Sequence, residues 1–218
     1  MESIFNKSIE NDSIIADKKG RIITIEGIDG SGKTTLAQNV VNEINFAGYK
    51  ACIFNTSSSF NVFWDVVNGC VRKKIITRDE NQIFHNVSFL TYLRTIFPEI
   101  LNNNDFLVTD WYIYGKMVLS ELYSETSAPS SLKVLESALY EGKIIEPTFP
   151  FYLDVPPEVA FQRIQNRKDI PEEKENLEML KQAALIWNKY VDKYDIERLD
   201  GTQNVKVLTK SLIDRIQL

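Results

Sequence analysis

Residues 21–34 read RIITIEGIDGSGKT. The first six residues favour a β-strand, and the last eight match the pattern G-x-x-x-x-G-K-S/T. Three glycines, Gly27, Gly30 and Gly32, let the backbone turn so tightly that successive N–H groups point into one phosphate-sized concavity. The helix expected after the loop directs the positive end of its dipole to the same point. We therefore predict a binding site for a nucleoside triphosphate.

The side chains of this loop complete the predicted donor site. Lys33 is long enough to reach the β- and γ-phosphates of ATP, and the Thr34 hydroxyl can bind the accompanying Mg²⁺. The alternative is a glycine-rich turn with a chance lysine, but strand, loop and helix occur in the order that phosphate binding requires. The residues predicted to bind ATP here are Gly27, Asp29, Gly30, Ser31, Gly32, Lys33, Thr34 and Thr35.

Composition and charge narrow the classes of function. The chain has 218 residues, of which 44% are hydrophobic, enough for one α/β domain with a single core. The net charge is -5, so we expect no broad basic face for a nucleic-acid polymer or an anionic membrane. The amino-terminal residues lack the apolar core of a signal peptide, which predicts a cytoplasmic location. The expected partners are small molecules, and the oligomeric state stays open, with a homodimer as one alternative.

The cysteines and the single histidine offer little for a metal site. Cys52 and Cys70 lie in apolar stretches, which favours buried thiols in a reducing compartment over a disulfide. His85 is the only histidine, so a metal cluster of several histidines is impossible. We expect His85 to be a partly buried helix residue, with a catalytic role as the less favoured alternative.

Strand-like and helix-like segments alternate from residue 21 to the end of the chain, whereas residues 1–20 are polar and predict an amino-terminal arm. The predicted strands are 21–26, 49–54, 105–109, 150–155 and 196–200. The predicted helices are 32–46, 60–73, 79–103, 111–125, 130–141, one beginning at 156, 171–194 and 203–217. This alternation predicts an α/β fold of the P-loop NTPase type, in which helices cover both faces of a parallel five-stranded sheet in a single domain, 21–218.

In such a sheet, ligands bind at the carboxyl ends of the strands. This rule places four segments around one cleft: the phosphate loop, residues 54–59, Asp110 and the stretch after Asp154. Asp110 follows an apolar strand and is well placed to hold the metal ion beside Thr34. The alternative role for Asp110 is that of N-cap for a helix beginning at Trp111, and the two roles are compatible.

Two arginines near residue 165 predict a lid, a segment that closes over the bound nucleotide. Arg163 and Arg167 are four residues apart, so they lie on one face of a helix. Phosphoryl transfer develops negative charge that a closing arginine can stabilise while it excludes water. The polar stretch that follows is interrupted by Pro171 and predicts a lid at about 164–176, with an ordinary linker as the alternative. The predicted catalytic residues are Lys33, Asp110, Arg163 and Arg167.

Several segments resemble the thymidylate kinase family, in the same order along the chain. The run IEGIDGSGKTT from Ile25 resembles the phosphate loop of the family, and LDVPPEVA from Leu153, followed by Arg163, resembles the segment leading into its lid. LDGTQ, ending at Gln203, resembles the strand end that flanks the adenine, which implies that Gln203 binds ATP. The resemblance spans residues 21–217. It implies transfer of the γ-phosphoryl group of ATP, with Mg²⁺, to a nucleoside monophosphate, dTMP by default.

The resemblance also implies an acceptor site. Asp29 would contact the acceptor sugar, and Arg94 would contact its base. Leu90, with Phe89 beside it, stands where the family has a stacking phenylalanine. The predicted acceptor-binding residues are Asp29, Phe89, Leu90, Arg94, Trp111 and Tyr112.

The acceptor phosphate clamp of the family is missing from this sequence. Trp111 replaces one of its two arginines, and no lysine or arginine occurs between Lys50 and Arg72, where the other is expected. A monophosphate dianion would therefore lose bidentate, charge-assisted partners. The alternative is that another cation supplies the charge, and the candidates are Arg72, Lys73, Lys74 and Lys116.

Three hypotheses follow. The first is a thymidylate-kinase-like enzyme, and the second is a kinase for an uncharged nucleoside or another small alcohol, with Asp29 or Asp110 as the base. The third is a catalytically degenerate nucleotide-binding protein. A GTPase switch is disfavoured because the sequence has no Asn-Lys-x-Asp motif.

Overall fold

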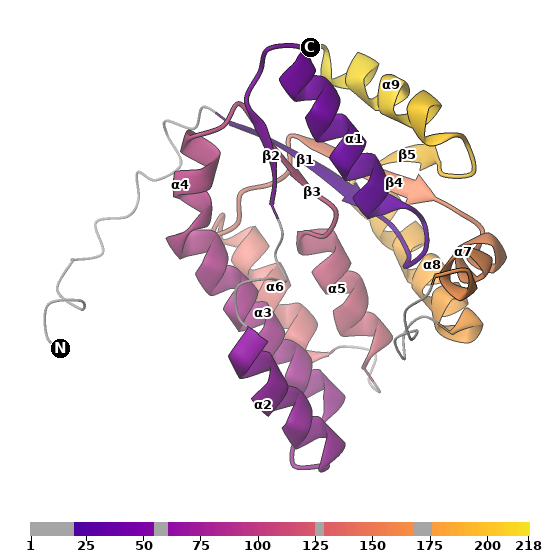
Figure 1. Cartoon of the computed structure of the whole chain (residues 1–218). Coiled ribbons are helices and arrows are strands. Elements are labelled where there is room, and N and C mark those ends of the chain that lie inside the picture. Colours follow the sequence, from indigo (N-terminus) through magenta and orange to yellow (C-terminus); the bar gives the residue numbers. More distant parts are fainter. Residues whose placement is uncertain (1–19, 55–60, 125–128, 168–175) are drawn as a thin grey trace, which may run out of the picture.

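The computed structural model describes residues 20–54, 61–124, 129–167 and 176–218, and a five-stranded parallel sheet lies at its centre (Figure 1). The strands are β1 (Arg21–Glu26), β2 (Ala51–Ile53), β3 (Phe106–Thr109), β4 (Phe149–Asp154) and β5 (Glu197–Asp200). Their order in the sheet is β2-β3-β1-β4-β5. This confirms the predicted α/β fold with a parallel five-stranded sheet. The predicted amino-terminal arm lies almost wholly outside the described residues.

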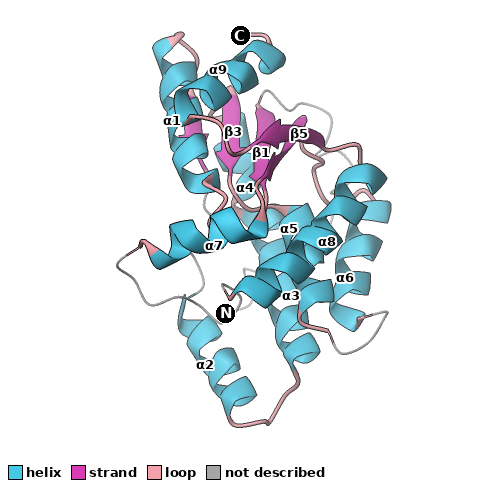
Figure 2. Cartoon of the chain, turned by 90° about the vertical axis from the view of Figure 1, so that its right-hand side faces the viewer, coloured by secondary structure: helices cyan, strands magenta, loops and turns pink. Residues whose placement is uncertain are grey.

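Helices cover both faces of the sheet (Figure 2). On one face, α1 (Lys33–Phe46) packs against α9 (Val205–Ile216). The other face carries α3 (Arg78–Thr95), α4 (Phe97–Asn102), α5 (Ile113–Leu122), α6 (Ser130–Tyr140) and α8 (Leu177–Lys193). Two further helices pack against this second layer, α2 (Asn61–Arg72) against α3 and α7 (Pro157–Gln165) against α8.

The central strand β1 explains why the sheet is buried on both faces. It pairs in parallel with β3 and β4, with Ile23 opposite Val108 on one side and Phe149 on the other. Ile22, Ile23 and Ile25 have at most 1% of their surface exposed. A run of β-branched side chains suits a strand whose two faces both meet helices.

Several helix boundaries differ from the predictions for identifiable reasons. The predicted helix 79–103 is two helices, because the helical path breaks at Ile96 and α4 restarts with Pro98 in its first turn, where the missing N–H of proline costs nothing. The predicted helix from Trp111 begins at Ile113. The long helix predicted at 171–194 is described from Leu177 onward, where the Asn176 side chain caps it.

The two thiols are free, as predicted, but the prediction that they are buried is wrong. Cys52 and Cys70 are both partly exposed. His85 is a partly buried residue of α3, as expected. None of the described helices is both long enough and apolar enough to cross a membrane.

Candidate active site

The phosphate loop joins the carboxyl end of β1 to α1, as its sequence predicts. Gly30 has a φ of 78°, and a Cβ on it would lie 2.4 Å from the carbonyl oxygen of Ala160 in α7. Gly32 is the N-cap of α1 and has a φ of 103°. Both conformations belong to the left-handed region that favours glycine. The loop therefore keeps its shape only with glycine at these two positions.

Lys33 lies across the mouth of this loop. Its Nζ donates to the carbonyl oxygen of Ile28 at 2.8 Å and is 3.7 Å from an oxygen of Asp29. The same Nζ is 5.6 Å from the centre of the Trp111 ring. Only 8% of the Lys33 surface is exposed, so its ammonium group is held at the loop and does not extend into solvent.

The structure brings the two predicted metal ligands together. The Thr34 hydroxyl donates to Asp110 Oδ2 at 2.5 Å, although 76 residues separate them in the chain. The alternative role of Asp110 as a helix cap is wrong, because Tyr112 is the N-cap residue of α5. A carboxylate and a hydroxyl are the hard oxygen donors that Mg²⁺ prefers, so these residues fit that ion. Among the described residues, no three His, Cys, Asp or Glu side chains are arranged so that they could hold a metal ion together, so an ion here needs phosphate oxygens and water as its further ligands.

Arg163 ties the phosphate loop to the turn after β5. Its guanidinium donates to the carbonyl oxygen of Ser31 at 2.8 Å and to that of Gly201 at 3.1 Å. Gln203 follows this turn, is exposed, and donates to Asp200 at 3.3 Å. These contacts place Arg163 at the donor site as an anchor of its backbone.

Arg167 is exposed and lies just beyond the end of α7. The structure therefore places it at the start of the predicted lid. Most of that lid, residues 168–175, falls outside the described part of the chain.

Sequence reasoning missed Glu26, the last residue of β1. Its side chain is completely buried, and its Oε1 accepts a hydrogen bond from the backbone N–H of Tyr112 at 3.0 Å. Burial raises the pKa of Glu26 to about 7, although the Tyr112 N–H and the Lys33 ammonium act against this shift. The sequence signal that could have identified Glu26 is a charged residue at the end of an otherwise apolar strand.

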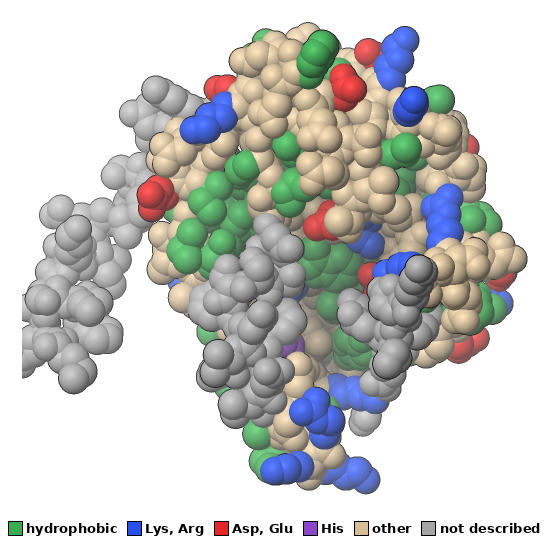
Figure 3. Space-filling model, viewed as in Figure 1, with side chains coloured by type: hydrophobic (Ala, Val, Ile, Leu, Met, Phe, Trp, Pro, Cys, Tyr) green, Lys and Arg blue, Asp and Glu red, His purple; other side chains and the backbone are tan. Residues whose placement is uncertain are grey.

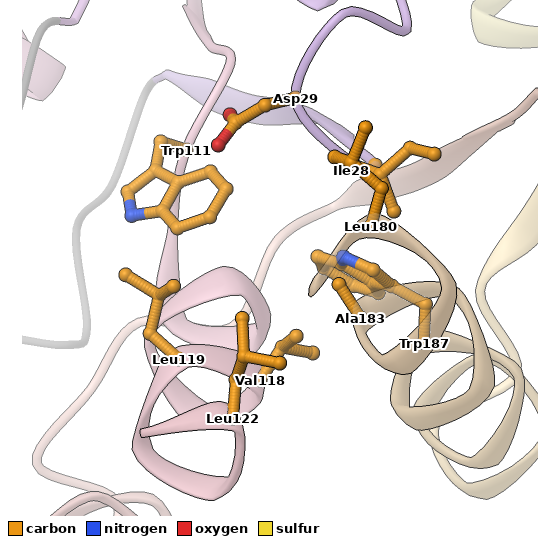
Figure 4. A pocket seen from close by; sticks show the side chains of 10 residues that line it. Ile28, Asp29, Trp111, Val118, Leu119, Leu122, Leu180, Ala183 and Trp187 are labelled. Carbon is orange, nitrogen blue, oxygen red and sulfur yellow. The ribbon is translucent and has the colours of Figure 1, made fainter. Parts of the chain in front are cut away.

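The region beside the phosphate loop, between Asp29 and α8, is largely apolar. Figure 3 shows a hollow on this face with hydrophobic side chains at its floor and charged groups at its rim. A pocket in this region is lined on one side by Asp29 and Trp111, whose side chains point toward one another (Figure 4). Its wall consists of Gly27, Ile28, Val118, Leu119, Leu122, Leu180, Ala183 and Trp187, mainly from α5 and α8. The pocket holds about 20 Å³, room for about one water.

The remaining predicted acceptor residues do not line this pocket, and their role in binding the acceptor stays a prediction. Phe89 and Leu90 are buried at 5% and 9% exposure, on the core side of α3. Tyr112 is also fully buried, and its hydroxyl donates to the carbonyl oxygen of Ile145 at 2.9 Å. Arg94 is exposed in the last turn of α3. The pKa of the nearby Glu141 is lowered mainly by hydrogen bonds with Lys143 and Ser137, and least by the charge of Arg94.

Of the four cations that could replace the missing clamp, Lys116 alone is buried. Arg72, Lys73 and Lys74 are exposed at the end of α2 and just beyond it. Lys116 is 5% exposed, and its Nζ is 5.6 Å from the centre of the Phe89 ring. The pKa of His85 falls to about 4, mainly because of burial and secondarily because of the positive charge of Lys116. A buried cation therefore lies between α3 and α5.

Comparison of the sequence with known proteins gives matches over most of the chain. Residues 25–212 match the family model described as thymidylate kinase. A thymidylate kinase of Buchnera aphidicola subsp. Baizongia pistaciae is 27% identical over 184 residues, which cover 80% of this chain and 82% of the relative. A thymidylate kinase of Leptospira interrogans (serovar copenhageni) is 27% identical over 200 residues, covering 91% and 94%. A probable thymidylate kinase of Methanosarcina barkeri is 24% identical over 205 residues, covering 91% and 96%.

Proposed function

Since the chain belongs to the thymidylate kinase family, a family of phosphotransferases, we propose that it transfers the γ-phosphoryl group of ATP to a nucleoside monophosphate. The first candidate acceptor is dTMP, the substrate that the names of its relatives imply. The single observation that carries the proposal is the Thr34–Asp110 hydrogen bond beside Lys33, because it unites a phosphate loop with a metal-binding carboxylate.

The residues of the donor side have distinct roles in this proposal. The backbone N–H groups of the loop bind the β-phosphate, and Lys33 exchanges its contact with Ile28 for the γ-phosphate. Thr34 and Asp110 would hold Mg²⁺, which when bound neutralises charge on the β- and γ-phosphate oxygens. Arg163 keeps the loop in place through Ser31, and Arg167 adds positive charge to the transition state from the start of the lid.

A monophosphate acceptor needs no general base, since its attacking oxygen is already anionic. Asp29, which lines the apolar pocket, is proposed to accept a hydrogen bond from the acceptor sugar. The small-molecule reaction agrees with a cytoplasmic location, which remains a prediction. The oligomeric state remains open.

The second candidate is a kinase for an uncharged nucleoside or another small alcohol. Trp111 favours it, because an aromatic ring beside Asp29 replaces a cation that a monophosphate would use. In that case Asp29 or Asp110 would accept the proton of the attacking hydroxyl. The third hypothesis, a degenerate protein without turnover, has no observation in its favour, since Lys33, Thr34 and Asp110 are all arranged around the loop.

The test is a product analysis. The protein is incubated with ATP, Mg²⁺ and each of a panel of nucleosides and nucleoside monophosphates, and the products are separated by chromatography. We expect dTDP and ADP in equal amounts from dTMP, and neither product from the Lys33→Ala variant. If no acceptor is phosphorylated by the wild-type protein, the proposed function is wrong. If thymidine is phosphorylated and dTMP is not, the second candidate replaces the first.

A further inference from the structure

The buried carboxylate of Glu26 has no part in the chemistry described above. Its exposure is 0%, and removing a carboxylate from water is unfavourable unless other contacts offset the loss. A glutamine or an apolar residue would avoid this cost at the end of β1. The contacts that Glu26 makes therefore indicate what it does.

Glu26 occupies the position of a helix cap, although it comes from a strand. Its Oε1 accepts from the N–H of Tyr112, the N-cap residue of α5, at 3.0 Å. Burial raises the pKa of Glu26, and the N–H of Gly115, the third residue of α5, acts with that of Tyr112 against this rise. α5 has no side-chain cap of its own. Backbone N–H groups of a first helical turn need acceptors, and a carboxylate is favoured at this end of the helix dipole.

Gly115 gives the carboxylate the space to approach. A Cβ at Gly115 would lie 2.9 Å from Glu26 Oε2 and 3.1 Å from a ring carbon of Trp111. Oε2 itself is buried without a hydrogen bond of normal geometry among the described residues. The carboxylate is therefore pressed against the backbone of α5, and a side chain at residue 115 would displace either Glu26 or Trp111.

The dipeptide Asp110-Trp111 is held from both ends. On the β3 side, the hydroxyl of Thr109 donates to the carbonyl oxygen of Trp111 at 3.0 Å. On the other side, Glu26 holds Tyr112. The dipeptide carries Asp110, the partner of Thr34, and Trp111, the ring beside Lys33. Its position decides whether a metal ligand faces the phosphate loop.

We propose that Glu26 is a positioning residue: by capping α5 from β1 it holds Asp110 against Thr34 and Trp111 beside Lys33. The inference deepens the proposed kinase function and rests on it, because Asp110 is expected to hold the metal of the donor. Glu26 touches neither substrate nor metal in this account. Glu26 affects turnover and the gain in nucleotide affinity that Mg²⁺ provides. It affects the affinity for the acceptor less.

The test uses two variants that disturb the contact from opposite sides. Glu26→Gln keeps the size of the side chain, and its amide oxygen can still accept from Tyr112, but the negative charge is lost and the NH₂ group would face the N–H of Gly115, a donor facing a donor. Gly115→Ala keeps Glu26 and crowds both its carboxylate and the ring of Trp111. Thr24→Val is the matched control, because Thr24 is a fully buried polar residue of the same strand whose hydroxyl has no hydrogen bond among the described residues.

Calorimetric titration measures the binding of ATP with and without Mg²⁺, which requires no turnover. We expect wild type and Thr24→Val to bind ATP more tightly when Mg²⁺ is present. In both test variants we expect this increase in affinity to be about tenfold smaller, while metal-free ATP binds as tightly as it does to wild type. In steady-state kinetics we expect kcat to fall about tenfold, the KM for the acceptor to change less than kcat, and raised Mg²⁺ to restore part of the rate.

Two results would overturn the proposal. One is an unchanged Mg²⁺ gain in both variants, and the other is an equal loss of ATP binding with and without Mg²⁺, which is the mark of general damage to the fold. A wild-type protein that binds ATP with Mg²⁺ but phosphorylates no acceptor would refute the proposed function alone. The titrations would still decide the role of Glu26 in that case.

Discussion

The donor side and the acceptor side of this cleft are held in different ways. On the donor side, hydrogen bonds join segments that are distant in the sequence, as between Thr34 and Asp110 or between Arg163 and the phosphate loop. On the acceptor side, the side chains are apolar except for Asp29, and Trp111 stands where a cation is expected. This difference agrees with the proposal of a complete ATP site next to an acceptor site that lacks the phosphate clamp of the family.

The largest effect should come from Lys33→Ala. The variant removes the cation at the loop mouth, so we expect transfer to fall by more than about 1,000-fold, while the melting temperature stays near that of wild type. A coupled assay for ADP and a thermal melt measure both quantities. Lys210→Ala, an exposed lysine of α9, is the control. Turnover at the wild-type rate would show that Lys33 does not act in phosphoryl transfer, and the proposed ATP site would be wrong.

The second effect should come from Arg167→Ala. A lid arginine acts chiefly on charge in the transition state, so we expect kcat to fall about 100-fold with little change in ATP affinity. Steady-state kinetics and calorimetry of ATP binding separate the two quantities. A loss of affinity with unchanged kcat would make Arg167 an ordinary contact of bound ATP.

A smaller effect should come from Trp111→Arg, which returns a cation to the acceptor side. We expect the preference for monophosphate over nucleoside to rise by about 1–3 kcal/mol, the contribution of a charge-assisted pair in a partly buried site. Trp111→Phe keeps an aromatic ring and should leave the preference unchanged. If the arginine variant binds dTMP and thymidine in the same ratio as wild type, residue 111 does not face the acceptor phosphate.

The smallest effect concerns the pKa of His85. The folded protein should hold this pKa near 4, below the ordinary 6.5, so the unfolded chain binds more protons between those values. His85 should therefore lower stability as the pH falls from 6.5 toward 4. NMR titration of the only imidazole measures the pKa directly, and Lys116→Met should raise it by removing the nearby charge. A wild-type pKa of about 6.5 would show that Lys116 and burial do not act on His85.

The donor side could be predicted from the sequence because its information is local. The phosphate loop is one contiguous motif, and its backbone conformation follows from the positions of Gly30 and Gly32. The approach of Asp110 to Thr34 follows from topology, because both residues come after the carboxyl ends of the adjacent parallel strands β3 and β1.

The acceptor side could not be predicted in the same way. Its residues come from separate helices, so a wrong helix face removes a residue from the site. The buried face of α3 could not be identified from its sequence, because the polar Gln82 and Asn86 are buried together with Phe89 and Leu90. The contact of Glu26 was also hidden: the charged residue at the end of an apolar strand is visible in the sequence, but its partner is a backbone N–H group that leaves no mark there.

The central claim is that a complete donor site faces an acceptor site without its phosphate clamp. Calorimetric titration of the wild-type protein with dTMP and with thymidine tests it most directly. The account predicts that the two dissociation constants lie within about tenfold of each other, a difference of about 1.4 kcal/mol or less. Binding of dTMP more than about 100-fold tighter than thymidine would contradict it, and would show that another cation, with Lys116 the first to examine, has rebuilt the clamp.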